Sequence, residues 1–190
     1  MSDTRQSRRR DPDNLMSMDE IRYRITESPV GFITIAGDDD AVTAVRMDDQ
    51  AHPPSGRADW VPDEDAFQHV VDQLDAYFAG DLTDFDVTLR LGGTDFQRRV
   101  WAGLLEIPYG ETVSYGALAA RIGQPTASRA VGLANGRNPV AIIVPCHRVI
   151  GSTGALTGYG GGLDRKRNLL ELERSRRQPQ LISTTEPRRI

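Results

Sequence analysis

The chain's only cysteine, Cys146, lies between Pro145 and His147 at the end of the apolar run "VAIIV". The nucleophilic form of cysteine is the thiolate. His147 is a potential proton acceptor beside the thiol, and the nearby positive charge of Arg148 could favour the thiolate. Pro145 stiffens the approach to the cysteine and has no backbone N–H to donate. These residue types indicate nucleophilic chemistry at Cys146.

Other interpretations of the cysteine stay open on these residues alone. A cysteine after an apolar run is usually a small hydrophobe in a strand, and neighbouring side chains need not face one another, so His147 could act through a water molecule. A cysteine hydrolase would use the same thiol with turnover, but it usually takes its histidine from elsewhere in the chain, where only His52 and His69 are present. A helix-turn-helix regulator without catalysis would leave the cysteine without a role.

The segment after the cysteine can form a pocket wall and a supporting helix. Six glycines lie from Gly151 to Gly162, around Tyr159. A glycine-rich backbone can approach a flat ligand closely because no side chain intervenes, although the same loop could be a linker. From about Leu163 the sequence predicts a helix with Glu173 near its end. Its apolar positions are Leu169, Leu170 and Leu172.

Before the cysteine, the sequence predicts a helix-turn-helix. One helix covers residues 114–121 and stops at Gly123 and Pro125, and a second covers about 126–135. The second helix leaves Arg129 as its dominant projecting charge, because its other surface residues are small. These small residues are Ala127, Ser128, Ala130, Gly132 and Ala134. Such a thin helix can enter a DNA groove, although helix pairs joined by a glycine turn also occur in proteins that never touch DNA.

A further helix is predicted at the start of the second half, in "TDFQRRVWAGLLEI". Thr94 and Gln97 have the spacing of a capping box. The apolar residues form one stripe, which predicts core packing. The stripe consists of Phe96, Val100, Trp101, Leu104 and Leu105.

Charge divides the chain into two halves. The net charge is −4, but residues 19–91 hold 5 basic and 17 acidic side chains, a net of −12, whereas residues 92–175 hold 10 and 6, a net of +4. Phosphate would be repelled by the first half and attracted by the second, so any DNA contact is expected from the second. We predict a scaffold domain at 18–91 and a C-terminal domain at 92–175. The polar, aperiodic residues 1–17 and 176–190 predict disordered tails.

In the N-terminal half, "IRYRI", "GFITIA" and "AVTAVRM" predict an antiparallel meander, and "FDVTLRL" predicts one more strand. "DEDAFQHVVDQLDAYFAG" predicts a helix with acidic residues at its start and Gly80 at its end. Its apolar face consists of Phe67, Val70, Val71, Leu74 and Phe78. The predicted fold class is α+β, with a small N-terminal domain of antiparallel sheet plus helix, followed by a mainly helical C-terminal domain with a helix-turn-helix.

The composition excludes several kinds of protein. One cysteine excludes a disulfide framework within the chain and a multi-cysteine metal site, and the three histidines lack metal-ligand spacing, so we expect no metal. The first residues include arginines but no apolar stretch, and the longest apolar run is "VAIIV", so we expect neither a signal peptide nor a membrane span. A lone thiol is typical of a reducing cytoplasm. We therefore predict a soluble cytoplasmic protein with no membrane partner.

Several motifs of the second half resemble those of the methylated-DNA–protein-cysteine methyltransferases, also called O6-alkylguanine-DNA alkyltransferases. "PCHRV" at 145–149 resembles the family's signature, and "SYGALA", "ASRAVG", "NPV", "GYGGG" and Glu173 occur in the family's order across residues 92–175. "GTDFQRRVWAGLLEIPYGETVSY" resembles its entry segment. The N-terminal half resembles the accompanying domain only in length, element order and stretches such as "SPVGFITIA", and it lacks the cysteines of the zinc-bearing members.

The resemblance implies direct reversal of DNA damage. Cys146 would take the alkyl group from O6-alkylguanine, and from O4-alkylthymine, irreversibly and once per molecule. The partner would be double-stranded DNA containing O6-alkylguanine, approached through the minor groove by the second helix of the helix-turn-helix, with the damaged nucleotide flipped into a pocket. The resemblance implies no cofactor and a monomer, and it leaves cooperative binding to DNA open.

The resemblance also assigns roles at the matching positions. Cys146 would be the nucleophile, while His147, Glu173 and a water molecule would carry its proton away. Tyr115 would crowd the target phosphate and stabilise N3 of the departing base. Arg129 would fill the space left by the extruded guanine. The other predicted DNA contacts are Tyr115, Ala127, Ser128 and Ala130.

A pocket for the flipped base is implied as well. The backbone carbonyls of Cys146 and Val149 would accept hydrogen bonds from the guanine amino group, and the Gly160 amide would donate to O6. The remaining predicted pocket residues are Tyr159 and Gly161 on the wall, and Asn138, which would brace the turn before the cysteine.

Overall fold

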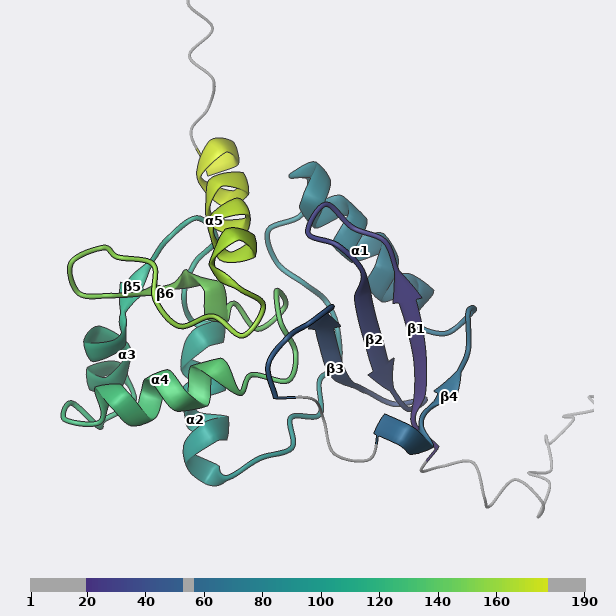
Figure 1. Cartoon of the computed structure of the whole chain (residues 1–190), viewed down its shortest axis with the longest axis horizontal. Helices are drawn as coiled ribbons and strands as arrows, with labels where there is room; N and C mark the ends of the chain where they lie inside the picture. Colours follow the sequence, from purple (N-terminus) through teal and green to yellow (C-terminus); the bar gives the residue numbers. More distant parts are fainter. Residues whose placement is uncertain (1–19, 53–56, 178–190) are drawn as a thin grey trace, which may run out of the picture.

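The computed structural model describes residues 20–52 and 57–177, which form two lobes side by side (Figure 1). The N-terminal lobe is a sheet with one helix and the C-terminal lobe is mainly helical, which confirms the predicted α+β class. The predicted tail at 1–17 and residues 178–190 of the other tail lie outside the described residues. Within the described ranges, no helix is long and apolar enough to cross a membrane.

The sheet has the strand order β3-β2-β1-β4. The three predicted strands form as β1 (Arg22–Thr26), β2 (Ile33–Gly37) and β3 (Val42–Met47), paired antiparallel. A short strand that was not predicted, β4 (Val61–Pro62), pairs parallel with β1 after the 3-10 helix η2 (Arg57–Asp59). The sheet is therefore mixed at its β4 edge, and β2 is buried along its whole length.

Helix α1 (Gln68–Ala79) covers one face of the sheet (Figure 1). The predicted acidic start is wrong, because Phe67 has a left-handed φ of 58° and the acidic residues before it lie in a turn outside the helix. The predicted end at Gly80 is confirmed, with φ 81°. Tyr77 is completely buried, which the apolar pattern did not predict.

The predicted strand at 85–91 is wrong, and the reason lies at the edge of β3 that faces away from β2. At one end of this edge Val42 exchanges two backbone hydrogen bonds, of 2.9 and 3.0 Å, with the 85–91 segment. Farther along, Val45 exchanges two, of 3.0 and 2.8 Å, with the segment that leads to Cys146. Because two segments share the edge, the first makes only an isolated bridge at Leu89.

In the C-terminal lobe, helix α2 (Asp95–Leu105) packs against both helices of the helix-turn-helix. The predicted capping box of Thr94 and Gln97 is confirmed. Trp101 is buried, and its indole N–H donates to the Ala134 carbonyl at 2.9 Å. Leu105, predicted in the core, is 48% exposed, since it is the last residue of the helix and is rotated away from Val100 and Leu104 on the buried face.

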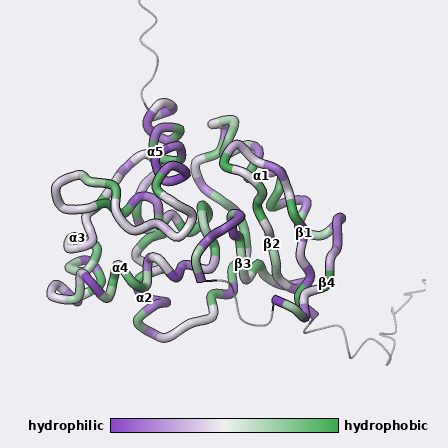
Figure 2. The backbone as a smooth tube through the Cα atoms, viewed as in Figure 1, coloured by the Kyte–Doolittle hydropathy of each residue, from purple (hydrophilic) through white to green (hydrophobic). Residues whose placement is uncertain are grey.

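The predicted helix-turn-helix consists of α3 (Tyr115–Arg121) and α4 (Ser128–Gly136). The Ser114 side chain caps α3 by accepting from Ala117 N at 3.1 Å. The last helix, α5 (Leu163–Arg177), ends two residues beyond the predicted domain boundary at 175. Although α5 is largely hydrophilic (Figure 2), its inner face is buried and reaches the centre of the C-terminal lobe.

Candidate active site

The backbone before Cys146 is a turn anchored on the sheet, and not the strand that the alternative interpretation of the cysteine assumed. Val140 bridges Val45 of β3, but Ile142 then takes a left-handed φ of 71°, which ends any extended pairing. The cysteine opens a short 3-10 helix, η3 (Cys146–Arg148). The edge of β3 therefore fixes where the thiol lies.

Asn138 holds this turn closed from inside. Its side chain is 1% exposed; Nδ2 donates to the carbonyls of Val140 (3.3 Å) and Val144 (2.7 Å), and Oδ1 accepts from the Val140 amide (3.1 Å). A buried amide with three such bonds restrains the backbone that carries Cys146.

His147 and Glu173 form a buried pair. Both side chains are completely buried, and His147 Nε2 lies 2.7 Å from Glu173 Oε1. Burial lowers the pKa of His147, and this outweighs the opposite effect of Glu173, so the imidazole is neutral at pH 7. The network assigns the proton to Nε2, which leaves Nδ1 as the basic nitrogen. Nδ1 is buried and has no hydrogen-bond partner among the described residues.

Glu173 collects hydrogen bonds from three parts of the chain. Its carboxylate accepts from Arg148 Nε at 3.0 Å and Nη2 at 3.0 Å, from the Gly110 amide at 2.9 Å and from the Tyr77 hydroxyl at 2.8 Å. Burial alone would raise the pKa of Glu173, but the bonds and charges of His147 and Arg148 lower it to about 2. The carboxylate is therefore ionised at neutral pH.

Arg148 does not support the thiolate, contrary to the interpretation of the sequence. Its guanidinium contacts Glu173 and donates through Nη1 to the Ile107 carbonyl at 2.6 Å. The positive charge that acts on the thiol is that of Lys166 on α5. Burial raises the pKa of Cys146, while a hydrogen bond from Asn138 and the Lys166 charge oppose that rise.

Lys166 is a completely buried lysine that the sequence-based prediction missed. Nζ donates to the carbonyls of Val149 (2.6 Å) and Thr157 (2.8 Å), and it lies 5.9 and 6.0 Å from the ring centroids of Tyr115 and Tyr159. Burial lowers its pKa to about 8, against the effect of Cys146. A signal was present, because Lys166 lies three, four and seven residues before Leu169, Leu170 and Glu173, which all face inward.

The glycine-rich loop is joined to the helix-turn-helix through Tyr115. The strands β5 (Val113–Ser114) and β6 (Val149–Ile150) pair in parallel, which places Tyr115 beside the backbone that follows Cys146. The Tyr115 hydroxyl lies 3.0 and 3.1 Å from the carbonyls of Thr157 and Gly158. Tyr115, which was predicted to be catalytic, thus also restrains the glycine-rich loop by hydrogen bonds.

The predicted wall residues lie in that loop. A Cβ on Gly161 would lie 3.0 Å from the Tyr159 ring and 3.1 Å from Met47 Sδ, so the close packing of these side chains favours glycine there. The Gly160 carbonyl accepts from the Ala51 amide at 3.0 Å. The Tyr159 hydroxyl is buried and has no hydrogen-bond partner among the described residues.

The predicted acceptor carbonyls already carry hydrogen bonds. The Cys146 carbonyl accepts from the Val149 amide and from Asn135 Nδ2 at 3.3 Å, and the Val149 carbonyl accepts from Lys166. Asn135 was not predicted. Cys146 itself is 4% exposed.

Of the predicted DNA contacts, Ser128, Arg129 and Ala130 begin α4, whereas Ala127 precedes that helix and Tyr115 begins α3. Arg129 and Ala130 are exposed, whereas Ala127 and Ser128 are half-buried. A shallow hollow of about 300 Å³ is lined by Tyr115, Ser128, Arg129 and Gly132. Leu133, which is 67% exposed on the same helix, adds apolar bulk that the prediction of a thin helix did not include.

Comparison with known proteins agrees with this geometry. The model of the 6-O-methylguanine DNA methyltransferase, DNA binding domain, matches residues 95–175, and that of the 6-O-methylguanine DNA methyltransferase, ribonuclease-like domain, matches residues 21–91. The chain belongs to the 6-O-methylguanine DNA methyltransferase family. Membership in this family means DNA repair by alkyl transfer to a protein cysteine.

Individual relatives cover most of the chain. It is 64% identical over 156 residues to the methylated-DNA–protein-cysteine methyltransferase of Mycobacterium bovis, which is 82% of this chain and 94% of the relative. It is 55% identical over 153 residues to that of Methanosarcina acetivorans, covering 80% and 98%. The crystal structure of Mycobacterium tuberculosis OGT in complex with DNA matches with a TM-score of 0.78 and 62% identity, covering 82% of this chain and 94% of that one.

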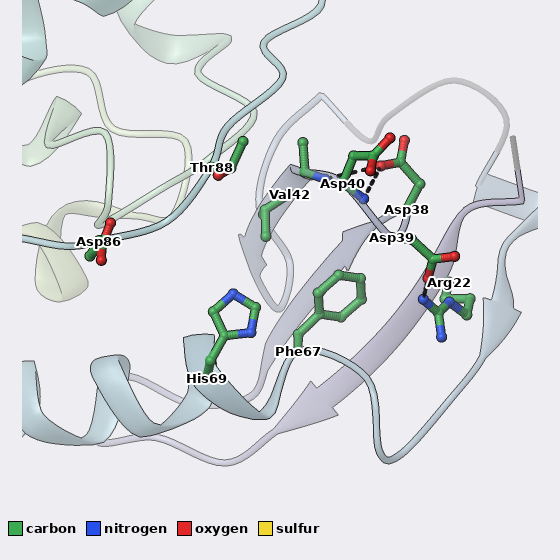
Figure 3. Close-up of a pocket in the computed structure, with 10 residues that line it drawn as sticks. Arg22, Asp38, Asp39, Asp40, Val42, Phe67, His69, Asp86 and Thr88 are labelled. Atoms are coloured by element: carbon green, nitrogen blue, oxygen red, sulfur yellow. Dashed lines mark hydrogen bonds and ion pairs between the residues drawn. The ribbon is translucent and has the colours of Figure 1, made fainter. Parts of the chain in front are cut away.

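In this alkyltransferase fold, a separate pocket of about 390 Å³ lies on the N-terminal lobe (Figure 3). Its lining includes the acidic residues 38–40 and, from the α1 side, Phe67 and His69, but none of the predicted site residues. His69 thus belongs to an acidic pocket on the other lobe from Cys146. Among the described residues, no group of three or more His, Cys, Asp or Glu could hold a metal ion.

Proposed function

We propose that Cys146 removes the alkyl group from O6-alkylguanine, and from O4-alkylthymine, in duplex DNA, irreversibly and once per protein molecule. The observation that carries the proposal is the buried His147–Glu173 pair next to the only thiol of the chain, with a histidine Nδ1 that no described residue hydrogen-bonds. The site therefore contains a nucleophile, a base for its proton and an ion that stabilises the charged base.

The proton of the thiol passes to His147 Nδ1 through a water molecule. Glu173 is ionised and its Oε1 lies 2.7 Å from Nε2 of His147, so it stabilises the imidazolium that forms. Lys166 stabilises the developing thiolate by its charge. This division of roles leaves Arg148 to hold Glu173 and not to act on sulfur.

The thiolate sulfur then attacks the alkyl carbon in line. The S–C bond forms as the C–O6 bond breaks, and the electron pair passes to the guanine, which Tyr115 stabilises by donating to N3. To make that bond, the Tyr115 hydroxyl must leave the carbonyls of Thr157 and Gly158. The product is a thioether, which has no acyl carbon for water to attack, so Cys146 is not regenerated.

Recognition of the base uses the backbone around the thiol. A carbonyl oxygen has two lone pairs, so the Val149 carbonyl can accept from the guanine amino group while it keeps Lys166. The Cys146 carbonyl already accepts two bonds, and the base must displace Asn135 from it. Because Cys146 is 4% exposed, the loop that carries Tyr159, Gly160 and Gly161 must move to admit the base.

The DNA would be approached with α4 in the minor groove. Arg129 is the exposed cation on that helix and fills the stack vacated by the flipped nucleotide, while Ala127, Ser128 and Ala130 allow close approach. The net charge of +4 over residues 92–175 favours this face over the acidic N-terminal lobe. The crystal structure of the Mycobacterium tuberculosis relative in complex with DNA supports DNA as the partner.

We further propose that the protein works as a monomer in the cytoplasm, where a single thiol stays reduced, and that it needs neither a metal nor a cofactor. Covalent product analysis distinguishes this activity from turnover by a cysteine hydrolase and from DNA binding without catalysis.

The experiment is incubation with a duplex that contains O6-methylguanine, followed by mass analysis of the tryptic peptide 138–148, which holds Cys146. We expect this peptide to gain the mass of one methyl group, and the Cys146→Ser protein to gain none while it still binds DNA. A methyl group on another residue, or an unmodified peptide after the lesion has disappeared, would rule the proposal out.

A further inference from the structure

The N-terminal lobe contributes one side chain directly to the buried network behind Cys146. Tyr77 lies on α1, is completely buried, and donates its hydroxyl to Glu173 Oε1 at 2.8 Å, across 96 residues of sequence. Burial and the Glu173 charge raise the pKa of Tyr77, so it stays a neutral donor.

Tyr77 bonds the same carboxylate oxygen that holds the histidine. Oε1 accepts from His147 Nε2 at 2.7 Å, from Tyr77 at 2.8 Å and from Arg148 Nη2 at 3.0 Å, whereas Oε2 accepts from the Gly110 amide at 2.9 Å and Arg148 Nε at 3.0 Å. Each donor to Oε1 stabilises part of the carboxylate charge, so the Tyr77 bond weakens the attraction of Oε1 for the His147 Nε2–H and also fixes the direction in which Oε1 points.

The ring of Tyr77 is held independently of its hydroxyl. It contacts Phe78 and Phe85, each at a centroid distance of 5.4 Å, and Tyr109 at 6.0 Å. Core packing thus accounts for an aromatic ring at this position but not for its oxygen. A phenylalanine would fill the same space.

We propose that Tyr77 is a positioning residue for alkyl transfer, through which the N-terminal lobe sets the orientation and basicity of the His147–Glu173 pair. The inference rests on the proposed function, in which neutral His147 receives the thiol proton. Without the hydroxyl, Oε1 carries more negative charge towards Nε2–H and stabilises the imidazolium. His147 is then protonated at a higher pH, and less of the protein holds it in the neutral form that can accept the thiol proton.

The ionisable groups that bear on this pair from the surrounding elements are unchanged by a substitution at Tyr77. They are Tyr109 before β5, Arg148 in η3, Tyr159 in the glycine-rich loop, and Lys166 on α5. Any displacement of the pH profile therefore reports the lost hydrogen bond.

The test is the single-turnover rate of methyl transfer from an O6-methylguanine duplex, measured against pH for wild type, Tyr77→Phe and Tyr109→Phe. Tyr109→Phe is the matched control, because it removes a neighbouring hydroxyl that is buried and has no partner among the described residues. We expect Tyr77→Phe to shift the acid limb upward by about 0.4–1.1 pH units, the equivalent of one hydrogen bond, and to leave the rate above the limb within about twofold of wild type. The Tyr109→Phe profile should overlay wild type.

A second variant tests the inference even if Tyr77→Phe does not fold. Incorporation of 3-fluorotyrosine at position 77 keeps the ring and makes the hydroxyl a stronger donor, so the acid limb should move to lower pH. Normalised profiles that coincide for wild type and either Tyr77 variant, whatever the absolute rates, would overturn the inference. If wild-type protein does not alkylate Cys146 at all, the proposed function fails instead, and the two failures are thus distinguishable.

Discussion

Replacing Glu173 by glutamine tests the energetics of the buried network. The substitution keeps the shape of the side chain but removes the charge that balances Arg148 and polarises His147. Loss of one partner from a buried ion pair typically costs about 3–5 kcal/mol. The pKa of Glu173 falls from an ordinary 4.5 to about 2, and at about 1.4 kcal/mol per tenfold change this corresponds to about 3 kcal/mol. Both arguments therefore give a loss of at least about 3 kcal/mol in unfolding free energy.

The pH dependence has a defined sign. A carboxyl whose pKa is lowered on folding contributes stability that is complete above its unfolded pKa of 4.5 and is lost as the pH falls towards about 2. The difference in unfolding free energy between wild type and Glu173→Gln should therefore be about 3 kcal/mol at neutral pH and about 1.4 kcal/mol near pH 3. At neutral pH the melting temperature should fall by about 6–12 °C.

The assay is urea unfolding of both proteins at several pH values, with Glu171→Gln as the matched control. Glu171 is an exposed glutamate on the same helix, so its substitution should change stability by less than about 0.5 kcal/mol. A loss for Glu173→Gln no larger than for the control, or one that does not shrink in acid, would refute the electrostatic role assigned to Glu173.

Three further substitutions address other parts of the site. Arg129→Ala should slow repair in duplex DNA about 10–100-fold, since unstacking a base costs a few kcal/mol, but it should leave transfer from free O6-benzylguanine nearly unchanged. The control Arg121→Ala on α3 should leave the rate with both substrates nearly unchanged. Equal losses on both substrates for Arg129→Ala would mean that Arg129 supports the fold. Lys166→Met should raise the pKa of Cys146, because the buried ammonium lowers it, and move the pH profile of iodoacetamide alkylation upward; an unmoved profile would contradict this. Asn138→Ala should lose about 2–4 kcal/mol in urea unfolding because three buried hydrogen bonds disappear, and a loss below about 1 kcal/mol would show that the turn holds without it.

Local chemistry made much of the fold predictable. The capping box of Thr94 and Gln97, the glycine end of α1 at Gly80 and the glycine-containing turn between α3 and α4 each depend on residues a few positions apart. The approach to Cys146 was not predictable in this way, because its shape depends on which segment occupies the free edge of β3. The same competition removed the predicted strand at 85–91.

In the candidate site, too, the features set by neighbouring residues were predictable and those set by tertiary contacts were not. The motif around Cys146 and His147 identified the chemistry, and the pattern of α5 placed Glu173 on a helix. The surroundings of these residues depend on tertiary contacts that the sequence does not encode locally. Tyr77 meets Glu173 across 96 residues, and the guanidinium of Arg148 bonds the buried carboxylate of Glu173 from 25 residues away. Lys166 could have been noticed only as a charge on an apolar helix face.

Titration of the protein with excess duplex containing O6-methylguanine tests the central claim most directly, because it counts the products that each thiol can make. An S-alkylcysteine offers no carbon that water readily attacks, and the chain has no second thiol to accept the group. We predict a plateau at one repaired guanine per protein molecule, with all of the transferred methyl on Cys146. Continued repair well beyond one product per molecule would mean that the thiol is regenerated, and this account of the site would be wrong.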